Sequence, residues 1–359
     1  MNKDSLLQLR DKIDAIDDKL LALLNQRMQI VKEVGKLKKQ ENTVIYRPER
    51  EQEIVDRLYK KTEGLLNREA LEAIFLEIFA ASRNLELPER VAFLGPEGSF
   101  THSAAEGRFG AMSDYLAMPD INSVFEAVVT QKARFGVVPI ENNQAGAVNE
   151  TLDSLEKFDL KIVAELALPI HLCLASTANA VQEITTIYSK DIAFRQCQMF
   201  IDKYLAGQQV ALVPVSSTSE AARKAHEAGR SAAAICSSVA AKLHKLPLLF
   251  QNIEDADNNI TRFLILAKDF ENQPGKLNKT TLIAHLANKP GSLANFLQDF
   301  YSREINLTKI ESRPVRGNKQ FTAWFYIEFD GHKNDEAVKE ILNIHQESVI
   351  WLGSYAKML

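Results

Sequence analysis

The sequence predicts a multidomain protein with an all-α domain of three helices, then a two-lobed α/β domain, then a ferredoxin-like βαββαβ domain. Three observations support this prediction. Apolar residues recur every three or four positions from 6 to 37, which is the spacing of a long amphipathic helix. Short apolar strands alternate with helical patterns between residues 90 and 270. After residue 278 the order is strand, helix, two strands, helix and strand.

Two short linkers divide the chain. One lies around Pro88, and the other is Gln273-Pro274-Gly275. We therefore expect domains at residues 1–88, 90–270 and 278–359.

The composition indicates a soluble globular protein and argues against several classes of function. The chain has 359 residues, of which 46% are hydrophobic and 25% charged. A net charge of -4 without a basic run gives no reason to expect nucleic acid. No window approaches the roughly 20 apolar residues of a membrane span, and the charged N-terminus does not read as a signal peptide. The three cysteines have no metal-ligand spacing, so we expect a cytoplasmic protein without a metal or cofactor.

The first helix is predicted to run through residues 6–37, with Asp4 or Ser5 as its cap. Pro48 suits the first turn of a second helix, which ends before Gly64. Asn67 is expected to cap a third helix. A single helix cannot bury the apolar stripe of residues 6–37, so it needs a partner from its own chain or from a second copy.

Cations on the first helix indicate a shared site. Arg27 and Lys38 are 11 residues apart, so they point the same way, roughly 16 Å apart along the axis. Arg10 lies ~25 Å from Arg27 on the same helix. Solvent exposure alone would explain any one of these residues. Arg10 can join the other two around one small ligand only from a second, antiparallel chain, which favours a homodimer or a higher homo-oligomer.

Together with residues of the other two helices, these cations resemble the all-helical chorismate mutases. The matching residues are Arg10, Arg27, Lys38, Arg50, Glu51, Ser82 and Glu86. The resemblance implies that Arg10 and Arg27 hold the carboxylates of chorismate, while Lys38 and Glu86 face its ether oxygen. The remaining residues are implied to shape the substrate pocket. The reaction is a pericyclic rearrangement, so holding the reactive conformer and stabilising charge on the oxygen suffice.

Two positions depart from the commonest mutase pattern. Arg47 stands where some relatives carry Asp, and Glu86 stands where some carry Gln. A carboxyl group donates a hydrogen bond only when it is protonated, so we predict mutase activity that falls as pH rises. Mutase rates measured from acid to alkaline pH test this, and a flat profile would contradict it.

The central region is expected to form a mostly parallel sheet with helices on both faces. A crossover through residues 162–175 can divide it into two lobes with a cleft between them. The predicted strands are 91–94, 135–140, 170–175, 186–188, 210–215, 232–235 and 263–266.

Polar turns follow several of these strands. The longest is Pro139-Ile140-Glu141-Asn142-Asn143-Gln144-Ala145-Gly146, between a strand and a helix. Others occupy residues 95–101, 216–218 and 236–238. Taken alone, each is explained better by helix capping than by ligand contact. Small ligands bind at such strand ends in α/β sheets, so several of them together indicate a cleft lined with hydroxyls and amides.

Over this region the sequence is similar to prephenate dehydratase. The matches are residues 95–101, 139–142 with 146 and 151–153, 188–189 with 196–197, and Asn259-Ile260-Thr261-Arg262-Phe263. The resemblance implies that Thr261 donates a proton to the departing hydroxyl, with no metal, cofactor or strong base. It implies substrate contacts from Ser99, Glu141, Asn142, Ser189, Gln196, Arg262 and Phe263.

Strand alternation qualifies some of these assignments. Thr261 and Arg262 are adjacent in a strand, so either the strand bends there or Arg262 is structural. The same rule points Glu141 away from the side of Asn142. Asn143 stands where the family usually has Ser, and Cys236 where a glycine is common.

The C-terminal region resembles the ACT domain of prephenate dehydratases. The resemblance implies phenylalanine binding between subunits and inhibition of the dehydratase. The implied residues are Pro290, Gly291, Ser292, Leu293, Glu311, Ser312, Arg313 and Pro314. A helix start beside Gly291 can receive the carboxylate of the amino acid, although a cap and a turn would explain the same residues.

Three hypotheses follow. The first is a bifunctional enzyme that converts chorismate to prephenate and then to phenylpyruvate, under inhibition by phenylalanine. The second is a sensor of aromatic amino acids with weakened catalytic sites, as the departures at Asn143 and Cys236 hint. The third uses arogenate in place of prephenate. The Thr261-Arg262-Phe263 and Arg10, Arg27 and Lys38 sets favour the first.

Overall fold

The computed structural model describes residues 3–41, 48–62, 64–86, 90–205, 207–256, 258–275, 277–315 and 323–357. The chain divides into two compact units, one of residues 1–89 with 109–114, the other of residues 90–108 with 115–359. Among the described helices, none is long and apolar enough to cross a membrane. The same described residues contain no group of three or more potential metal ligands.

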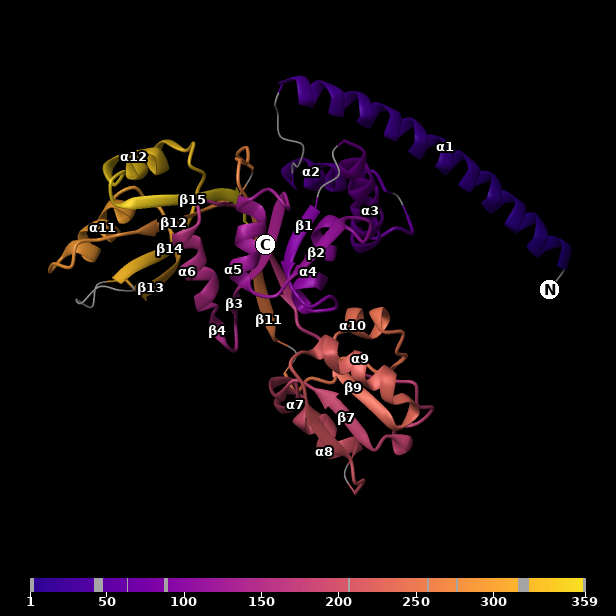
Figure 1. Cartoon of the computed structure of the whole chain (residues 1–359). Helices are drawn as coiled ribbons and strands as arrows, with labels where there is room; N and C mark the ends of the chain where they lie inside the picture. Colours follow the sequence, from indigo (N-terminus) through magenta and orange to yellow (C-terminus); the bar gives the residue numbers. More distant parts are fainter. Residues whose placement is uncertain are drawn as a thin grey trace. The chain divides into compact units, whose positions relative to one another are not determined.

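The first unit contains the three predicted helices, α1 (Lys3–Glu41), α2 (Pro48–Tyr59) and α3 (Arg68–Glu86), which are labelled in Figure 1. The side-chain oxygen of Asn67 accepts a hydrogen bond from the Ala70 N–H at 2.8 Å, which confirms the predicted cap of α3. Both α1 and α2 contact α3. Much of the apolar stripe on α1 stays exposed, for example Ile13 at 56% and Ile16 at 61%.

The second unit begins with a sheet whose main order is β2-β1-β3-β11-β5, with β4 paired to β3. Its strands are β1 (Arg90–Leu94), β2 (Asp114–Met118), β3 (Phe135–Asn142), β4 (Gly146–Ala147), β5 (Lys161–Pro169) and β11 (Ile260–Ala267). Its helices are α4 (Phe100–Phe109), α5 (Ile121–Val129) and α6 (Asn149–Lys157). Apolar side chains of α5 and α6, such as Phe125 and Leu152, pack on Val138 of β3.

A second sheet, in the order β10-β6-β9-β7-β8, forms the other lobe. Its strands are β6 (Cys173–Ser176), β7 (Thr186–Ser189), β8 (Ala211–Pro214), β9 (Ala232–Cys236) and β10 (Leu248–Phe250). Its helices are α7 (Asp191–Gln196), α8 (Gln198–Tyr204), α9 (Thr218–Ala228) and α10 (Ser238–Leu243), with short 3-10 turns at Val181–Glu183 and Gly229–Ser231. The two predicted lobes are therefore present.

The predicted mostly parallel sheet is wrong, because both sheets are mixed. β1 is parallel to β3, but β11 is antiparallel to β3 and to β5. In the second lobe β7 is parallel to β8 and β9, whereas β6 is antiparallel to β9 and β10. The chain leaves the first sheet after β5 and returns to it through β11. The predicted crossover, residues 162–175, contains most of β5 and the start of β6, so the chain passes from the first sheet to the second within it.

The last domain has the predicted βαββαβ order. It consists of β12 (Asn278–Ala284), α11 (Ser292–Tyr301), β13 (Leu307–Pro314), β14 (Ala323–Asp330), α12 (Glu336–Ile344) and β15 (Val349–Ala356), with sheet order β13-β14-β12-β15. Phe296 of α11 and Ile341 of α12 pack on one face of the sheet, with Ile327 of β14.

The other face of this sheet packs against the first sheet of the α/β region. Trp324 and Tyr326 share one core with Val138 and Leu264. A Cβ atom on Gly353 of β15 would collide with the carbonyl oxygen of Ile162 in β5, so the two backbones touch there. The C-terminal domain and the α/β region are therefore packed as one unit.

Candidate functional site

Asn142 and Thr261 meet where β3 and β11 pair as antiparallel strands. The Asn142 side-chain amide donates to Thr261 Oγ1 at 2.9 Å and to Asn259 Oδ1 at 2.7 Å. Its oxygen accepts from the backbone N–H groups of Gln144 and Ala145 at 3.0 and 2.9 Å, which fixes the orientation of the amide. Because Thr261 Oγ1 accepts the bond from Asn142, its own hydrogen remains free to point at a ligand.

Residues of both lobes approach this pair. Gln196, at the end of α7, donates to the side-chain oxygen of Gln144 at 3.3 Å. Asn143 donates to the carbonyl oxygen of Asn258 and accepts from the Ile260 N–H at 3.0 Å. Asn143 thus holds the start of β11, so its departure from the family pattern has a structural role here.

Three other predicted residues have structural partners. Ser189 is fully buried and donates its hydroxyl to the carbonyl oxygen of Ile235 at 2.7 Å. Ser99 donates to the carbonyl oxygen of Leu94 at 3.0 Å. Phe263 is 1% exposed and belongs to the core. The structure therefore brings Asn142 and Thr261 together and places Gln196 against Gln144 of the adjoining turn. The side chains of Ser99, Ser189 and Phe263 are directed elsewhere.

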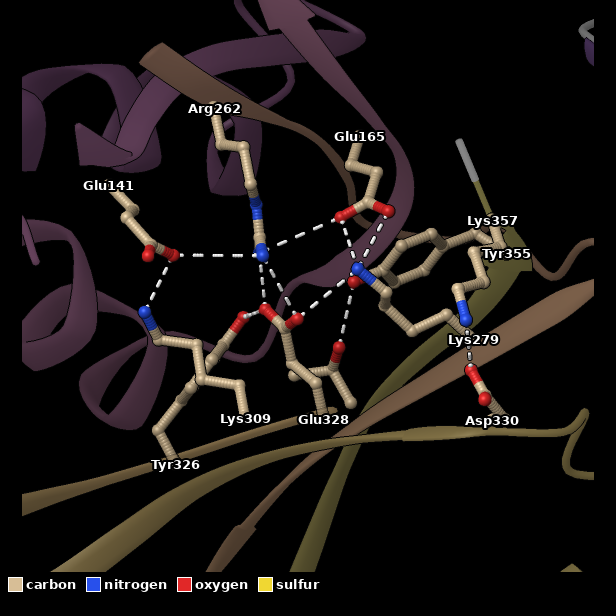
Figure 2. Close-up of polar contacts among 11 residues, drawn as sticks. Glu141, Glu165, Arg262, Lys279, Lys309, Tyr326, Glu328, Asp330, Tyr355 and Lys357 are labelled. Carbon is tan, nitrogen blue, oxygen red and sulfur yellow. Dashed lines mark hydrogen bonds and ion pairs between the residues drawn. The ribbon is translucent and has the colours of Figure 1, made fainter. Parts of the chain in front are cut away.

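Glu141 and Arg262 lie on the opposite face of the strands, as alternation predicts. Glu141 Oε2 is 2.6 Å from Lys309 Nζ of β13. Arg262 forms a two-pronged ion pair with Glu328 of β14, in which Nη1 lies 3.2 Å from Oε2. Figure 2 shows both side chains directed to the C-terminal domain. The structure does not bring Glu141 and Arg262 to the side of the Thr261 hydroxyl.

Glu328 is the centre of a buried charge cluster (Figure 2). Glu328 is fully buried and accepts a hydrogen bond from the Tyr326 hydroxyl at 2.8 Å. It lies 3.2 Å from Lys279 Nζ, and the same lysine lies 2.8 Å from Glu165. Burial alone would raise the pKa of Glu328, but the cations Arg262 and Lys279 outweigh it and lower that pKa. Burial likewise opposes the charged form of Arg262, yet Glu328 and Glu165 raise its pKa. Glu328 and Arg262 are therefore both charged at neutral pH.

In the helical domain the structure brings Arg27 and Ser82 together. Arg27 Nη1 donates to Ser82 Oγ at 2.5 Å, and the Ser82 hydroxyl donates to the carbonyl oxygen of Ile78 at 2.6 Å. Arg10 is exposed on α1, and Arg50 is exposed and pairs with Glu53 at 3.0 Å. The side chains of Lys38 and Glu86, and the whole of Arg47, lie outside the described residues.

Two buried residues of these sites were missed from the sequence. Arg83 is 5% exposed, pairs with Glu51 and donates to the carbonyl oxygen of Phe109 at 2.9 Å. Asn259 is 5% exposed and holds Asn142. Their positions in the sequence could have identified them. Arg83 directly follows the predicted site residue Ser82, and Asn259 is the first residue of the matched stretch that contains Thr261.

The three cysteines are free and buried. Burial raises the pKa of Cys197 to about 12. Cys236 faces Cys173 across β9 and β6, and the Cys173 thiol together with burial raises the pKa of Cys236. Thiols of this kind are inert packing groups, so the departure at Cys236 concerns packing and not nucleophilic chemistry.

The two predicted regulatory segments lie at one end of the C-terminal sheet. Phe325 of β14 pairs with Ala284 of β12 on one side and with Ser312 of β13 on the other. The loop after β12 therefore begins at the same level of the sheet as Ser312. That loop leads to Gly291, which starts α11 with φ of 85° and gives it no side-chain cap. Arg313 points elsewhere, to Asp153 of α6 at 2.7 Å.

Family models match three successive parts of the chain. Chorismate mutase type II matches residues 9–87, prephenate dehydratase residues 91–271 and the ACT domain residues 280–345. The bifunctional chorismate mutase/prephenate dehydratases of Aquifex aeolicus and Pseudomonas aeruginosa are each 39% identical to this chain. Each match covers 99% of this chain and 99% of the relative. The structure of prephenate dehydratase in complex with L-Phe from Arthrobacter aurescens is 31% identical, with a TM-score of 0.67, and the match covers 75% of this chain and 90% of that one. The chain therefore belongs to the family of bifunctional chorismate mutase/prephenate dehydratases.

Proposed function

We propose that the chain rearranges chorismate to prephenate in its helical domain and converts prephenate to phenylpyruvate in its α/β domain, under feedback inhibition by phenylalanine. The observation that carries this proposal is the Asn142–Thr261 pair in a domain of the dehydratase family, with Gln196 of the other lobe bonded to Gln144 in the turn after Asn142. The reaction sequence belongs to phenylalanine biosynthesis.

The dehydratase step asks little of the protein. The bond to the ring carboxylate breaks, its electron pair moves into the ring, carbon dioxide leaves and hydroxide departs from the opposite carbon. Aromatisation supplies the driving force, so the enzyme needs to orient prephenate and assist the departure of hydroxide. Thr261 donates the proton that turns hydroxide into water. Asn142 orients the Thr261 hydroxyl by donating to its oxygen.

Substrate contacts are assigned to the side of the sheet that carries Thr261. We assign Asn142 and Gln196 to prephenate, because their amides lie beside that hydroxyl or reach toward it from the other lobe. Ser99, Ser189 and Phe263 support the walls of the site from within the two lobes. Glu141 and Arg262, the other two implied contacts, lie on the opposite face of the strands. There they hold the C-terminal domain through Lys309 and Glu328.

The mutase site needs two copies of the chain. Arg27 and Ser82 come from one copy, whereas Arg10 is 17 residues from Arg27 on the same helix, or ~25 Å away. A chorismate molecule bound to Arg27 therefore meets the Arg10 of a second copy. The exposed stripe on α1 supports the same assembly, a homodimer or a higher homo-oligomer, which we expect in the cytoplasm.

Phenylalanine is assigned to the two regulatory segments, 290–293 and 311–314. The N–H groups at the start of α11 suit its carboxylate. Ser312 and Pro314 are exposed on β13 in the same region of the sheet. The solved relative from Arthrobacter aurescens was crystallised with L-Phe, which supports the same ligand for this chain.

The experiment that tests this function adds chorismate to the purified chain and follows its loss and the formation of phenylpyruvate. We expect both, with phenylpyruvate formation slowed by phenylalanine. Accumulation of prephenate alone would mean that the α/β domain is inactive, as the sensor hypothesis requires. A parallel assay with arogenate separates the two possible substrates of that domain.

A further inference from the structure

Strand β13 of the C-terminal domain has two faces with different neighbours. Lys309 and Arg313 lie opposite Glu328 and Trp324 of β14, so they share the face that packs against the dehydratase domain. The alternate residues, such as Ile310 and Ser312, point to the other face and are exposed. One strand thus touches the dehydratase domain with one face and carries part of the proposed phenylalanine site on the other.

Both basic side chains of β13 hold one segment of the dehydratase domain. Lys309 Nζ lies 2.6 Å from Glu141, which immediately precedes Asn142 (Figure 2). Arg313 lies 2.7 Å from Asp153 and also donates to Asn149 at 2.7 Å, both in the helix that follows the turn after Asn142. The held segment, residues 141–153, therefore contains the amide that orients the Thr261 hydroxyl.

The two links differ from the charge cluster around Glu328. That cluster is buried and its two cations balance its two anions, so opening it would leave charges unpaired away from water. Glu141 is 30% exposed and also lies 3.6 Å from Arg262 Nη1, so it keeps access to water and a longer ionic contact when the Lys309 pair opens. The cluster suits a fixed anchor between the domains, and the Lys309 pair suits a contact that opens and closes.

β13 is also placed to move. It is the edge strand of its sheet and pairs only with β14 among the described strands. A shift of this strand would change the Lys309 contact without opening the anchor on β14 and β12. Coupling between two sites requires such an element, whose arrangement both ligands bias.

We propose that Lys309 is a positioning residue of the dehydratase site and that its pair with Glu141 transmits feedback inhibition. Phenylalanine bound at the exposed face of β13 opens the pair. In this released state Glu141 keeps its longer contact with Arg262, at 3.6 Å, and the adjoining Asn142 amide is displaced. The Thr261 hydroxyl then loses its orientation and the dehydratase slows. This inference rests on the proposed function, namely dehydratase activity at Thr261 and phenylalanine binding at 290–293 and 311–314.

The test is Lys309→Met in the full-length chain. Without the cation the site adopts the released state permanently, so the dehydratase kcat falls by the factor by which saturating phenylalanine inhibits the unmodified chain, about 5- to 150-fold for a typical coupling. Phenylalanine then adds little further inhibition, although calorimetry still detects its binding. Mutase activity, measured on the same sample, stays unchanged, and the retained phenylalanine binding shows that the second unit is folded. Lys309→Arg keeps the cation and retains both activity and inhibition.

Lys333→Met is the matched control. Lys333 also belongs to the C-terminal domain and pairs with a glutamate of the preceding region, Glu271, at 2.5 Å. Its partner lies outside residues 141–153, so this variant keeps the normal dehydratase rate and normal inhibition. If Lys333→Met changed the dehydratase rate and its inhibition as much as Lys309→Met, Lys309 would be one of several contacts that hold the two domains together. That result would overturn the proposal.

Other outcomes are also decisive. A Lys309→Met chain with the unmodified rate and full inhibition would show that the pair carries no signal. Loss of phenylalanine binding in this variant would place Lys309 in the ligand site and equally reject the inference. If the unmodified chain itself lacked dehydratase activity or inhibition by phenylalanine, the proposed function would fail before the inference is tested.

Discussion

Replacing Thr261 with valine lowers the dehydratase rate by about 10²- to 10⁴-fold, the usual contribution of a positioned proton donor, and leaves mutase activity unchanged. Valine keeps the β-branched shape that suits the strand but has no hydroxyl. The Asn142 amide still has Asn259 and the Ile260 carbonyl oxygen as acceptors, so no buried donor is orphaned. Phenylpyruvate formation from prephenate measures the effect, with chorismate loss as the internal reference.

Two further variants sharpen this test. Thr186→Val makes the same chemical change in β7 of the other lobe, and full dehydratase activity is expected. Asn142→Ala lowers the rate because it removes the group that orients the Thr261 hydroxyl. Since the two residues act as a unit, the double variant loses much less than the product of the single effects. Undiminished turnover in Thr261→Val would remove this residue from the mechanism, and the same result in Asn142→Ala would remove the orienting role.

Local rules explain which predictions from the sequence succeeded. Period-two alternation put Arg262 and Glu141 on the face opposite Thr261 and Asn142, and the contacts with Glu328 and Lys309 agree. Helix spacing and an asparagine cap gave the three N-terminal helices, because these signals lie within a few residues of each other. The βαββαβ order of elements in the C-terminal domain followed in the same way.

Long-range features were beyond such rules. Asn142 and Thr261 are 119 residues apart, and no local pattern states that their strands pair in antiparallel register. The expectation of a mostly parallel sheet failed for the same reason, since the direction of β11 depends on where the chain returns. Burial was equally hidden. Ser189 was implied as a substrate contact by the resemblance, and no local pattern states that it is fully buried.

Partner choice is the third kind of information that the sequence lacks. The chain contains 47 acidic residues, so nothing local identifies Glu328 as the partner of Arg262. The pairing results from the packing of the C-terminal sheet on the first sheet of the α/β region. This packing brings the Glu328 carboxylate and the Arg262 guanidinium face to face. The contacts between the α/β region and the C-terminal sheet are therefore tertiary features, whereas Thr261, the proposed proton donor, was found through a short motif.

Mixing two inactive variants, Arg10→Ala and Arg27→Ala, is expected to restore mutase activity. Alone, each variant loses a charge-assisted contact to a carboxylate and falls by on the order of 10²- to 10³-fold. If Arg10 and Arg27 of one site come from different copies, a mixed dimer has one site with both arginines and one with neither. Random pairing of equal amounts makes half of the dimers mixed, so about a quarter of the sites are intact.

The structure supplies a matched control for this experiment. Arg27 and Ser82 are bonded within one chain, so a mixture of Arg27→Ala with Ser82→Ala contains no site with both groups intact. That mixture is expected to recover no activity beyond the mean of its components. Both mixtures are prepared by unfolding and refolding the chains together, and mutase rates are compared with those of unmixed samples treated alike. The length of the helix keeps Arg10 and Arg27 of one copy too far apart to share one chorismate. Absence of recovery in their mixture would therefore mean that Arg10 of a second copy does not complete the site, and the exposed apolar stripe of α1 would need a different explanation.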